Sequence, residues 1–240
     1  MPEYLIPARS RSDRRPGGHA QPALKRCLAL AGLALLASMS VQARHHSKAT
    51  HEGEAGAFDY FVLSLSWAPT YCLTHADDGE ECSSKGYGFV LHGLWPQYDS
   101  GGYPERCQSD FDLSAEAAAT GRTLYPSARL MSHEWQEHGT CSGLSALDYF
   151  RAADRGTAAV KIPEEFDAPR SDRTLTADQV LELFRRDNPG MPAGAMTVAC
   201  NRATVSEIRI CLTRDLGVRS CGRGVHTSCP RVPLRVPAAR

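Results

Sequence analysis

The segment "YFVLSLSW", residues 60–67, decides the fold because its side chains alternate along the chain. Phe61, Leu63, Leu65 and Trp67 would lie on one face, and two serines occupy positions on the other. An apolar period of two is typical of a β-strand with one buried face. We therefore expect a half-buried strand here, and the rest of the chain must supply strands that pair with it.

Three further segments predict such partner strands. Residues 87–91 ("YGFVL") are rich in apolar and aromatic residues and run directly into His92, which would then lie at a strand end. Residues 203–212 alternate again, with apolar side chains facing inward and a glutamate and an arginine facing outward. Residues 197–200 are expected to pair with this segment.

Helices are predicted at three places. Thr176 and Gln179 form a capping-box pattern, and the apolar spacing that follows ends at 188–190, "NPG". Residues 144–153 and 130–138 are the other two candidates. Strands and helices are interspersed without a regular βαβ rhythm, so we expect an α+β fold with a mainly antiparallel central sheet flanked by helices.

The first 43 residues have the layout of a secretory signal. Basic residues Lys25 and Arg26 precede an apolar run of 15 residues at 27–41, and a small residue follows at Ala43. A membrane anchor is the alternative, but a spanning helix needs about 20 apolar residues. We predict export to the periplasm or the medium, with no membrane association after cleavage.

Cleavage after residue 43 would leave 197 residues, enough for one domain with a sizeable core. The removed segment holds six Lys/Arg and two Asp/Glu, so the remainder has a net charge of −4. Such a chain has no bulk attraction for nucleic acid, and a polyanion must be held by a local site. We predict a flexible lead-in at 44–56, one domain at 57–229 and a Pro/Arg-rich tail at 230–240, extended or frayed, in a monomer.

Eight of the nine cysteines lie beyond the predicted signal. An even number of cysteines in an exported chain predicts disulfides, here four, although spacing alone does not fix the pairing. Zinc is the alternative, and the absence of any C-x-x-C pair disfavours it. The eight are Cys72, Cys82, Cys107, Cys141, Cys200, Cys211, Cys221 and Cys229.

Residues 132–141, "SHEWQEHGTC", gather two histidines and two glutamates in ten positions. One interpretation is a metal site of the H-E-x-x-H kind. Here, however, His133 and His138 are five residues apart, which places them about 140° apart around a helix. Both could not bind one ion from a regular helix, so we predict no metal.

Acid–base chemistry is the second interpretation of this segment. An imidazole can accept or donate a proton near neutral pH, and a reaction with a nucleophile and a leaving group needs two such groups. Glu134 and His138 are one helical turn apart, so the carboxylate could orient that ring. His92 could supply the second imidazole.

Two segments of the chain resemble the signatures of the ribonuclease T2 family of secreted endoribonucleases. They are "HGLWP" at 92–96 and "HEWQEHGTC" at 133–141. Three more stretches agree with the family pattern: "FVLSLSWAPTYC" at 61–72, "YP" at 103–104 and "SEIRICLT" at 206–213. Two long motifs in the right order are a specific signal.

The resemblance covers about residues 58–229 and implies an endoribonuclease that cleaves single-stranded RNA with little base specificity and no cofactor. The 2′-hydroxyl attacks its own phosphate to give a 2′,3′-cyclic phosphate, which water then opens to a 3′-phosphate. The resemblance implies that His138 is the base and His92 the acid. It also implies that Glu134 supports the transition state and His138, and that His133 contacts the phosphate.

Base binding is implied at three further positions. Trp95 and Tyr103 match family positions that sandwich a base, and such stacking is worth about 1–3 kcal/mol. The alternative for Trp95 is a core aromatic. Gln97 stands where several relatives have an aspartate that binds a purine, so we expect a weaker base preference.

Glu137 stands where the family usually has a lysine before the second catalytic histidine. A cation there would stabilise the phosphate charge, and a carboxylate cannot unless it points away or an arginine supplies the charge. This departure favours an alternative function, a catalytically weak or silent relative that acts as a secreted RNA-binding or inhibitory protein. A zinc hydrolase is a third possibility.

The resemblance also implies the disulfide pairing. The expected bridges are Cys72–Cys82, Cys107–Cys141, Cys200–Cys229 and Cys211–Cys221.

Overall fold

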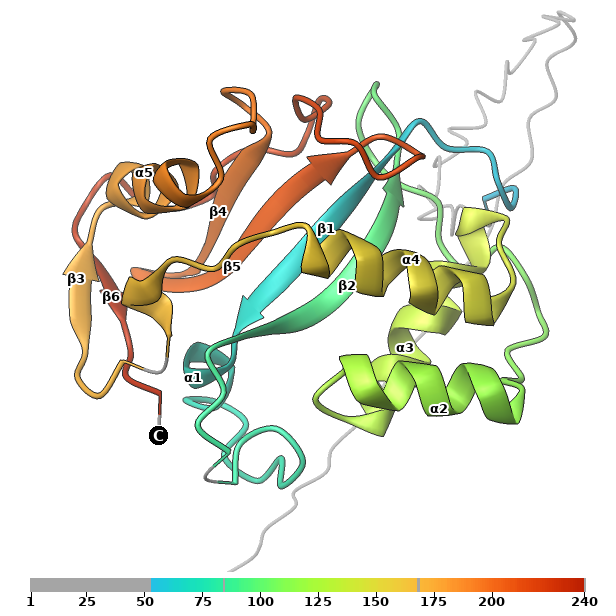
Figure 1. The fold of residues 1–240 in the computed structure, drawn as a ribbon, viewed down its shortest axis with the longest axis horizontal. Helices are drawn as coiled ribbons and strands as arrows, with labels where there is room; N and C mark the ends of the chain where they lie inside the picture. The colour runs from blue at the N-terminus through green and yellow to red at the C-terminus, as the bar shows by residue number, and fades with distance from the viewer. Residues whose placement is uncertain (1–52, 84, 168, 240) are drawn as a thin grey trace, which may run out of the picture. The chain divides into compact units, whose positions relative to one another are not determined.

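Strand β1 (Tyr60–Trp67) lies inside a six-stranded sheet, as Figure 1 shows. The structure is a computed structural model, which describes residues 53–83, 85–167 and 169–239. The predicted signal peptide and residues 44–52 of the predicted lead-in fall outside the described residues. The other strands are β2 (Phe89–Gln97), β3 (Arg173–Leu175), β4 (Met196–Asn201), β5 (Thr204–Leu212) and β6 (Leu234–Val236).

The sheet is mixed and mainly antiparallel. Its order is β2-β1-β5-β6-β3, and β4 pairs with β5 as well. Every pairing is antiparallel except the short contact between β5 and β6, where Thr204 lies opposite Arg235. The α+β fold with a mainly antiparallel sheet, expected from the sequence, is confirmed.

The helices that pack around the sheet begin at recognisable caps. Ser127, Ser145 and Thr176 each accept a backbone N–H at the start of a helix, and Gln179 completes the capping box at the third. The three predicted helices therefore form, with shifted ends. The helices are α1 (Ala68–Tyr71), α2 (Ala115–Leu124), α3 (Ala128–Glu137), α4 (Ala146–Ala158) and α5 (Ala177–Asp187), with 3₁₀ turns at Gly139–Ser142 and Glu164–Phe166.

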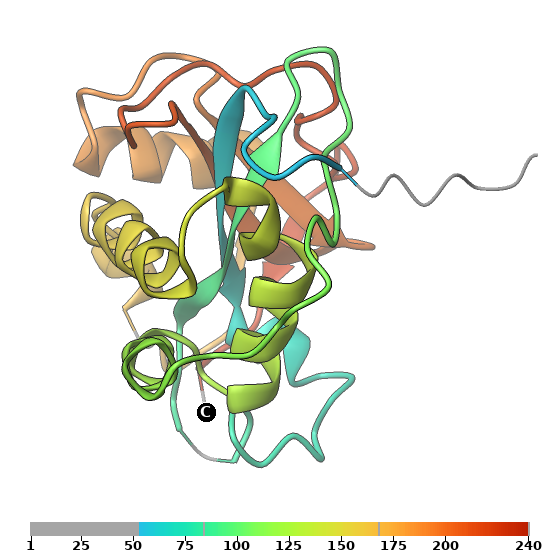
Figure 2. The same ribbon diagram turned by 90° about the vertical axis from the view of Figure 1, so that its right-hand side faces the viewer.

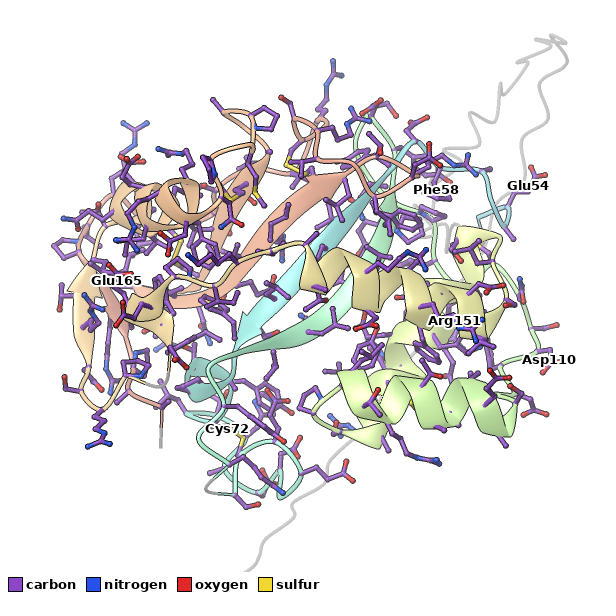
Figure 3. The ribbon with its side chains drawn as sticks, viewed as in Figure 1. Glu54, Phe58, Cys72, Asp110, Arg151 and Glu165 are labelled. Carbon is purple, nitrogen blue, oxygen red and sulfur yellow. A yellow bond between two sulfur atoms is a disulfide. The ribbon has the colours of Figure 1, made fainter. Side chains whose placement is uncertain are left out.

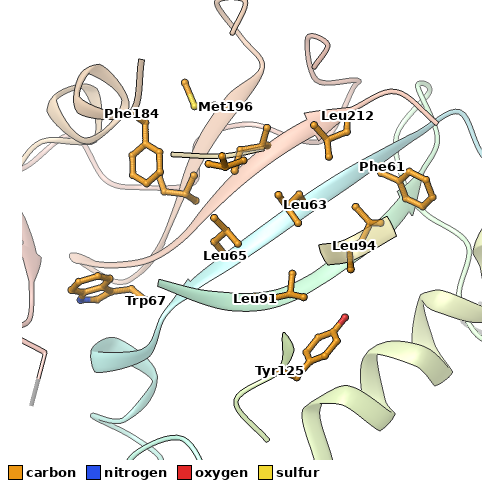
Figure 4. Packing of buried hydrophobic residues seen from close by; sticks show 14 of the residues in the cluster. Phe61, Leu63, Leu65, Trp67, Leu91, Leu94, Tyr125, Phe184, Met196 and Leu212 are labelled. Carbon is orange, nitrogen blue, oxygen red and sulfur yellow. The ribbon is translucent and has the colours of Figure 1, made fainter. Parts of the chain in front are cut away.

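The main core fills the space between the sheet and helices α4 and α5, which Figure 2 shows on the same side of the strands. Leu63 and Leu65 of β1 lie in this core with Phe184 of α5, as Figure 4 shows. At the surface, Arg151 of α4 pairs with Glu116 of α2 at 3.1 Å (Figure 3).

Strand β1 is buried on both faces, so the prediction of a half-buried strand was wrong. Tyr60, Val62 and Ser64 on the second face are as buried as the apolar residues on the first. Tyr60 and Val62 form a smaller cluster with Cys211, packed against residues of the C-terminal loop such as Val225. The side chains of a polar site also lie on this second face and contribute to its burial.

Strand β2 contains an irregularity at His92. Ser64 lies opposite Gly93 and Leu65 opposite Leu91, so His92 is an extra residue without a partner, a β-bulge. The prediction that His92 lies at a strand end was wrong, because the strand continues through it to Gln97.

The bulge changes which side chains share a face. In a regular strand, Leu91 and Leu94 would point to opposite faces, because successive side chains alternate. With one residue bulged out, both leucines enter the main core, and His92 and Trp95 point to the opposite face of the sheet.

All four disulfides implied by the family resemblance are present and confirm that pairing. Two of them fasten the segment after β5 to the sheet, because they join it to cysteines on β4 and β5. The bridges are Cys72–Cys82, Cys107–Cys141, Cys200–Cys229 and Cys211–Cys221.

Residues 230–239 of the segment predicted as a tail are part of the domain, which corrects the boundary at 229. Leu234 and Val236 are fully buried in β6, and the indole of Trp67 donates to the carbonyl of Pro237 at 3.0 Å. Prolines flank the strand without interrupting its short ladder, so the segment is extended but not frayed.

One further boundary of the domain, and one property of its helices, can be described. At the N-terminal end of the described chain, the backbone N–H of Gly56 donates to the carbonyl of Cys141 at 2.9 Å, so this part of the predicted lead-in contacts the domain. Across residues 53–83, 85–167 and 169–239, no helix is both long and apolar enough to cross a bilayer.

The burial of β6 predicts a measurable loss of stability. Leu234→Ala should lower the free energy of unfolding by about 2–5 kcal/mol, because it leaves a cavity in a closed core. Val232→Ala is the matched control, since Val232 is 47% exposed and should change stability by less than about 0.5 kcal/mol. Denaturant unfolding measures both, and equal midpoints would contradict the assignment of β6 to the core.

Candidate active site

The polar face of the sheet brings side chains from three strands together. His92 and Trp95 come from β2, Glu207 and Arg209 from β5, and Ser64 from β1. The strand register explains why these side chains lie together, because Ser64 lies opposite Arg209 on one side and opposite Gly93 on the other. Glu207 and Arg209 were predicted to face outward; they leave the main core as expected, but they face this site.

His92 lies between two carboxylates. Its Nδ1 is 3.1 Å from Oε1 of Glu207, and its Nε2 is 3.6 Å from Oε1 of Glu134. Burial alone would lower the pKa of His92, but the hydrogen bond to Glu207 and the charges of the two carboxylates outweigh burial and raise it. The surroundings of the ring therefore favour its protonated form.

Glu134 is a buried carboxylate on α3 with 1% of its surface exposed. The indole Nε1–H of Trp95 donates to its Oε2 at 2.7 Å. Burial raises the pKa of Glu134 to about 7, although the charge of His92 and the Trp95 hydrogen bond oppose this rise. The absence of a side chain at Gly93 is required here, because a Cβ would overlap the Glu134 carboxylate and the Trp95 indole nitrogen.

The expected support of His138 by Glu134 is absent within the described residues, where the two side chains share no hydrogen bond. Helix α3 ends at Glu137, and His138 caps it with φ −121° and ψ −46°, outside the helical range. The backbone N–H of His138 still donates to the carbonyl of Glu134 at 3.1 Å, so one turn joins the two backbones although no hydrogen bond joins the side chains. The Glu134 carboxylate lies beside His92 and Trp95 instead.

His138 is the second imidazole of the site. Burial lowers its pKa to about 3, and the charges of His92 and His133 add to this effect. Its Nδ1 is buried and has no hydrogen-bond partner in the described part of the chain. The ring centres of Trp95 and Tyr103 lie 5.4 and 5.8 Å from that of His138, and the Trp95 ring, 5.0 Å from His92, contacts both histidines.

A pocket of about 330 Å³ opens beside His138. Tyr103 at its rim is 45% exposed, whereas Gln97 is buried and its amide donates to the carbonyl of Pro96 at 3.0 Å. The guanidinium of Arg209 lies 5.3 Å from the ring centre of Trp95. The residues that line the pocket include Trp95, Gln97, Tyr103, His138, Arg209 and Arg223.

A second pocket, of about 460 Å³, opens beside His92. His133, which is exposed, lines it together with Arg129 and the buried Glu81. Burial and the nearby charge of Asp78 raise the pKa of Glu81 to about 7. The four predicted binding residues therefore divide, with His133 at this pocket and the other three at the pocket beside His138.

Glu137 is held by a neighbouring arginine. Its carboxylate forms an ion pair with the guanidinium of Arg106, and its backbone carbonyl accepts the N–H of the same residue at 3.0 Å. The carboxylate thus has a cation directly against it, which cancels much of its charge near His138.

Sequence reasoning missed three residues of the site. Glu207 and Arg209 carried a signal, since they alternate with apolar residues on a strand whose partner strand bears serines. Arg223 carried a weaker one, because it lies between two cysteines that fasten its loop to the sheet. As for metal ligands, the described ranges contain no group of three or more His, Cys, Asp or Glu arranged to hold an ion.

Comparison with known proteins identifies the family. A model of the ribonuclease T2 family matches residues 58–221, which include both histidines, Glu134 and both β5 residues of the site. The chain belongs to the ribonuclease T2 family. The family expected from the two signature segments is therefore confirmed.

Among curated members, a ribonuclease of Aeromonas hydrophila is 44% identical over 133 residues, which are 54% of this chain and 56% of that protein. A probable ribonuclease of Haemophilus influenzae is 26% identical over 178 residues, 68% of this chain and 61% of that protein. The chain thus spans between half and two thirds of the length of these two relatives.

Solved T2 structures share the fold. An RNase-related protein from Calystegia sepium aligns with a TM-score of 0.63 at 22% identity, over 76% of this chain and 98% of that one. RNase NT in complex with 5′-AMP aligns with a TM-score of 0.61 at 23% identity, over 75% of this chain and 98% of that one.

The close approach at Gly93 predicts the effect of adding one methyl group. Gly93→Ala should lower the free energy of unfolding by about 1–3 kcal/mol, because the new Cβ must displace Glu134 or Trp95. Gly79→Ala is the control, since a Cβ there meets no atom within 4 Å. Denaturant unfolding compares the two variants, and an undisturbed Gly93→Ala protein would contradict the packing described here.

Proposed function

We propose that this chain is a metal-independent endoribonuclease that cleaves single-stranded RNA with little base specificity. The observation that carries the proposal is a pair of histidines whose environments push their pKa values in opposite directions. The pKa of His92 is raised, so it can donate a proton, and that of His138 is lowered, so it can accept one.

In the first step, His138 takes the proton of the ribose 2′-hydroxyl, and the 2′-oxygen forms a bond to phosphorus. The bond from phosphorus to the 5′-oxygen of the next nucleotide breaks, and His92 protonates that oxygen through Nε2. The product is a 2′,3′-cyclic phosphate and a free 5′-hydroxyl. Each proton transfer contributes on the order of 10²–10⁴-fold in rate.

In the second step, water replaces the departed nucleotide. His92, now neutral, takes a proton from this water, whose oxygen attacks phosphorus. The bond to the 2′-oxygen breaks, and His138 returns its proton there, which leaves a 3′-phosphate. Glu134, whose pKa of about 7 lets it exist in both forms near neutrality, supports His92 and the transition state from its buried position.

The two pockets suit the nucleosides on either side of the cleaved bond. The nucleoside whose 2′-hydroxyl attacks would lie beside His138, where Tyr103 offers an exposed aromatic ring for stacking. The leaving nucleoside would lie beside His92 and His133. Gln97 is buried with its amide turned to Pro96, which favours weak base recognition at this position.

A catalytically silent RNA-binding protein is the alternative function, and Glu137 is the observation behind it. The ion pair with Arg106 weakens this argument, because the carboxylate is neutralised by its neighbour. Arg209 also lines the pocket that contains His138, where it is paired with Glu207 at 2.7 Å.

We further propose that the chain is exported and acts as a monomer outside the cytoplasm. Four disulfides support export, because such bridges form and persist in oxidising compartments.

The function is tested by incubating purified protein with single-stranded RNA in EDTA and identifying the product ends by mass spectrometry. We expect cleavage that gives 2′,3′-cyclic and then 3′-phosphate ends. His92→Ala and His138→Ala should each lower the rate by about 10²–10⁴-fold. His226→Ala is the control, an exposed histidine outside both pockets. Cleavage that stops in EDTA, or folded His variants with normal turnover, would refute the proposal.

The Arg106–Glu137 ion pair predicts a compensating pair of substitutions. Arg106→Gln should lower kcat/KM about fivefold, the effect of about 1 kcal/mol of repulsion between a freed carboxylate and the phosphate. Adding Glu137→Gln should restore most of the loss, because the repelling charge is then removed. Cleavage rates at low salt measure both variants, and a double variant as slow as the single one would show that Glu137 does not act on the substrate.

A further inference from the structure

Glu207 is a charged residue at the site to which the reaction described above gives no part. Only 14% of its side chain is exposed, and it comes from β5, the strand on the far side of β1 from His92. One oxygen is 3.1 Å from Nδ1 of His92. The other accepts the hydroxyl of Ser64 at 3.2 Å and lies 2.7 Å from Arg209.

We propose that Glu207 is the positioning residue of His92. The Glu207 carboxylate accepts the Nδ1–H of the ring, and this hydrogen bond directs Nε2 to the scissile phosphate. The inference rests on the proposed RNA cleavage, in which His92 acts through Nε2. It assigns to β5 a part in proton transfer, although Glu207 itself touches neither the substrate nor a reacting atom.

The geometry fixes the ring from one side. A histidine ring turns about two side-chain bonds, and a hydrogen bond at Nδ1 selects one orientation and one tautomer. With Nδ1–H held by Glu207, the proton that leaves His92 is the one on Nε2. After transfer, the neutral ring presents a free lone pair at Nε2, which is what the water-activating step requires.

The two carboxylates beside His92 are not equivalent. Burial would raise the pKa of Glu207, but the hydrogen bond and charge of His92, together with Arg209, outweigh burial and lower it to about 2. Glu207 is therefore charged at every working pH. Glu134, with a pKa of about 7, changes charge near neutrality and contacts His92 at the longer distance of 3.6 Å. Of the two carboxylates, Glu207 is the one that stays charged and lies at hydrogen-bond distance from His92.

Other charged groups also face His92, and they set the background for any titration. The carboxylates favour its protonated form, and the cations oppose it. The groups are Glu134, Arg129 and His133 from α3, His138 from the end of that helix, Arg209 from β5, and Glu81 from the loop before β2. Replacing Glu207 alone leaves all of these groups in place.

Glu207→Gln tests the proposal, because the amide oxygen can still accept from Nδ1 but carries no charge. NMR titration of His92 should show a lower pKa than in the wild-type protein. The alkaline limb of the kcat/KM profile for RNA cleavage should move to lower pH by the same amount, since the acid must be protonated to act. At pH 7.5, kcat/KM should fall on the order of tenfold with KM little changed.

Three comparisons separate positioning from a structural role. Glu207→Asp keeps the charge and should retain the raised pKa of His92 better than Glu207→Gln. Glu207→Ala should lose the Nδ1–H tautomer of the neutral ring, which nitrogen chemical shifts report. Glu116→Gln, which removes an exposed carboxylate paired with Arg151 on α2 and α4, should move neither the titration nor the profile.

The outcomes are decisive in each case. A Glu207→Gln protein that loses stability but keeps the pKa of His92 and the pH profile would show that Glu207 is merely structural. A wild-type protein that does not cleave RNA would sink the proposed function, and the NMR titration would still decide whether Glu207 controls His92.

Discussion

The bulged residue in the pairing of β1 and β2 is the constraint on which the rest of the structure depends. By taking His92 out of the ladder, it lets Leu91 and Leu94 both enter the main core while His92 and Trp95 point to the opposite face. The bulge links stability to chemistry, because burial of the two leucines fixes the register that aims the imidazole. Bulges are known for re-aiming side chains beside active sites.

Electrostatics on the polar face follow from unequal burial and pairing. Both histidines contact the ring of one tryptophan, yet one lies beside two carboxylates and the other beside two aromatic rings. The first gains a proton more easily and the second loses it more easily than free histidine. Burial acts on both Glu134 and Glu207, but their pKa values differ. Burial raises the pKa of Glu134, whereas His92 and Arg209 outweigh burial and keep Glu207 charged.

Much of this arrangement could be predicted from the sequence, and the failures have physical causes. Period-two alternation located β1 and β5, and the capping box at Thr176 located α5, because both signals are local. The bulge at His92 was missed because register is a property of two strands and not of one. The burial of β6 was missed because its partners β3 and β5 lie far away in sequence. The orientation of His138 by Glu134 was expected from helical spacing; that spacing holds for the backbone, but the Glu134 carboxylate lies against His92 and Trp95 instead.

The loop from Cys221 to Cys229 has a consequence for when the site becomes complete. It contains no helix or strand, supplies Arg223 and Val225 to one pocket wall, and is joined covalently to β5 and β4 through Cys211–Cys221 and Cys200–Cys229. In a reducing cytoplasm both bonds would be open, and the wall would be held by hydrogen bonds and by the packing of Val225 against Tyr60 and Val62. Thiol oxidation would then fix this pocket wall covalently to the sheet.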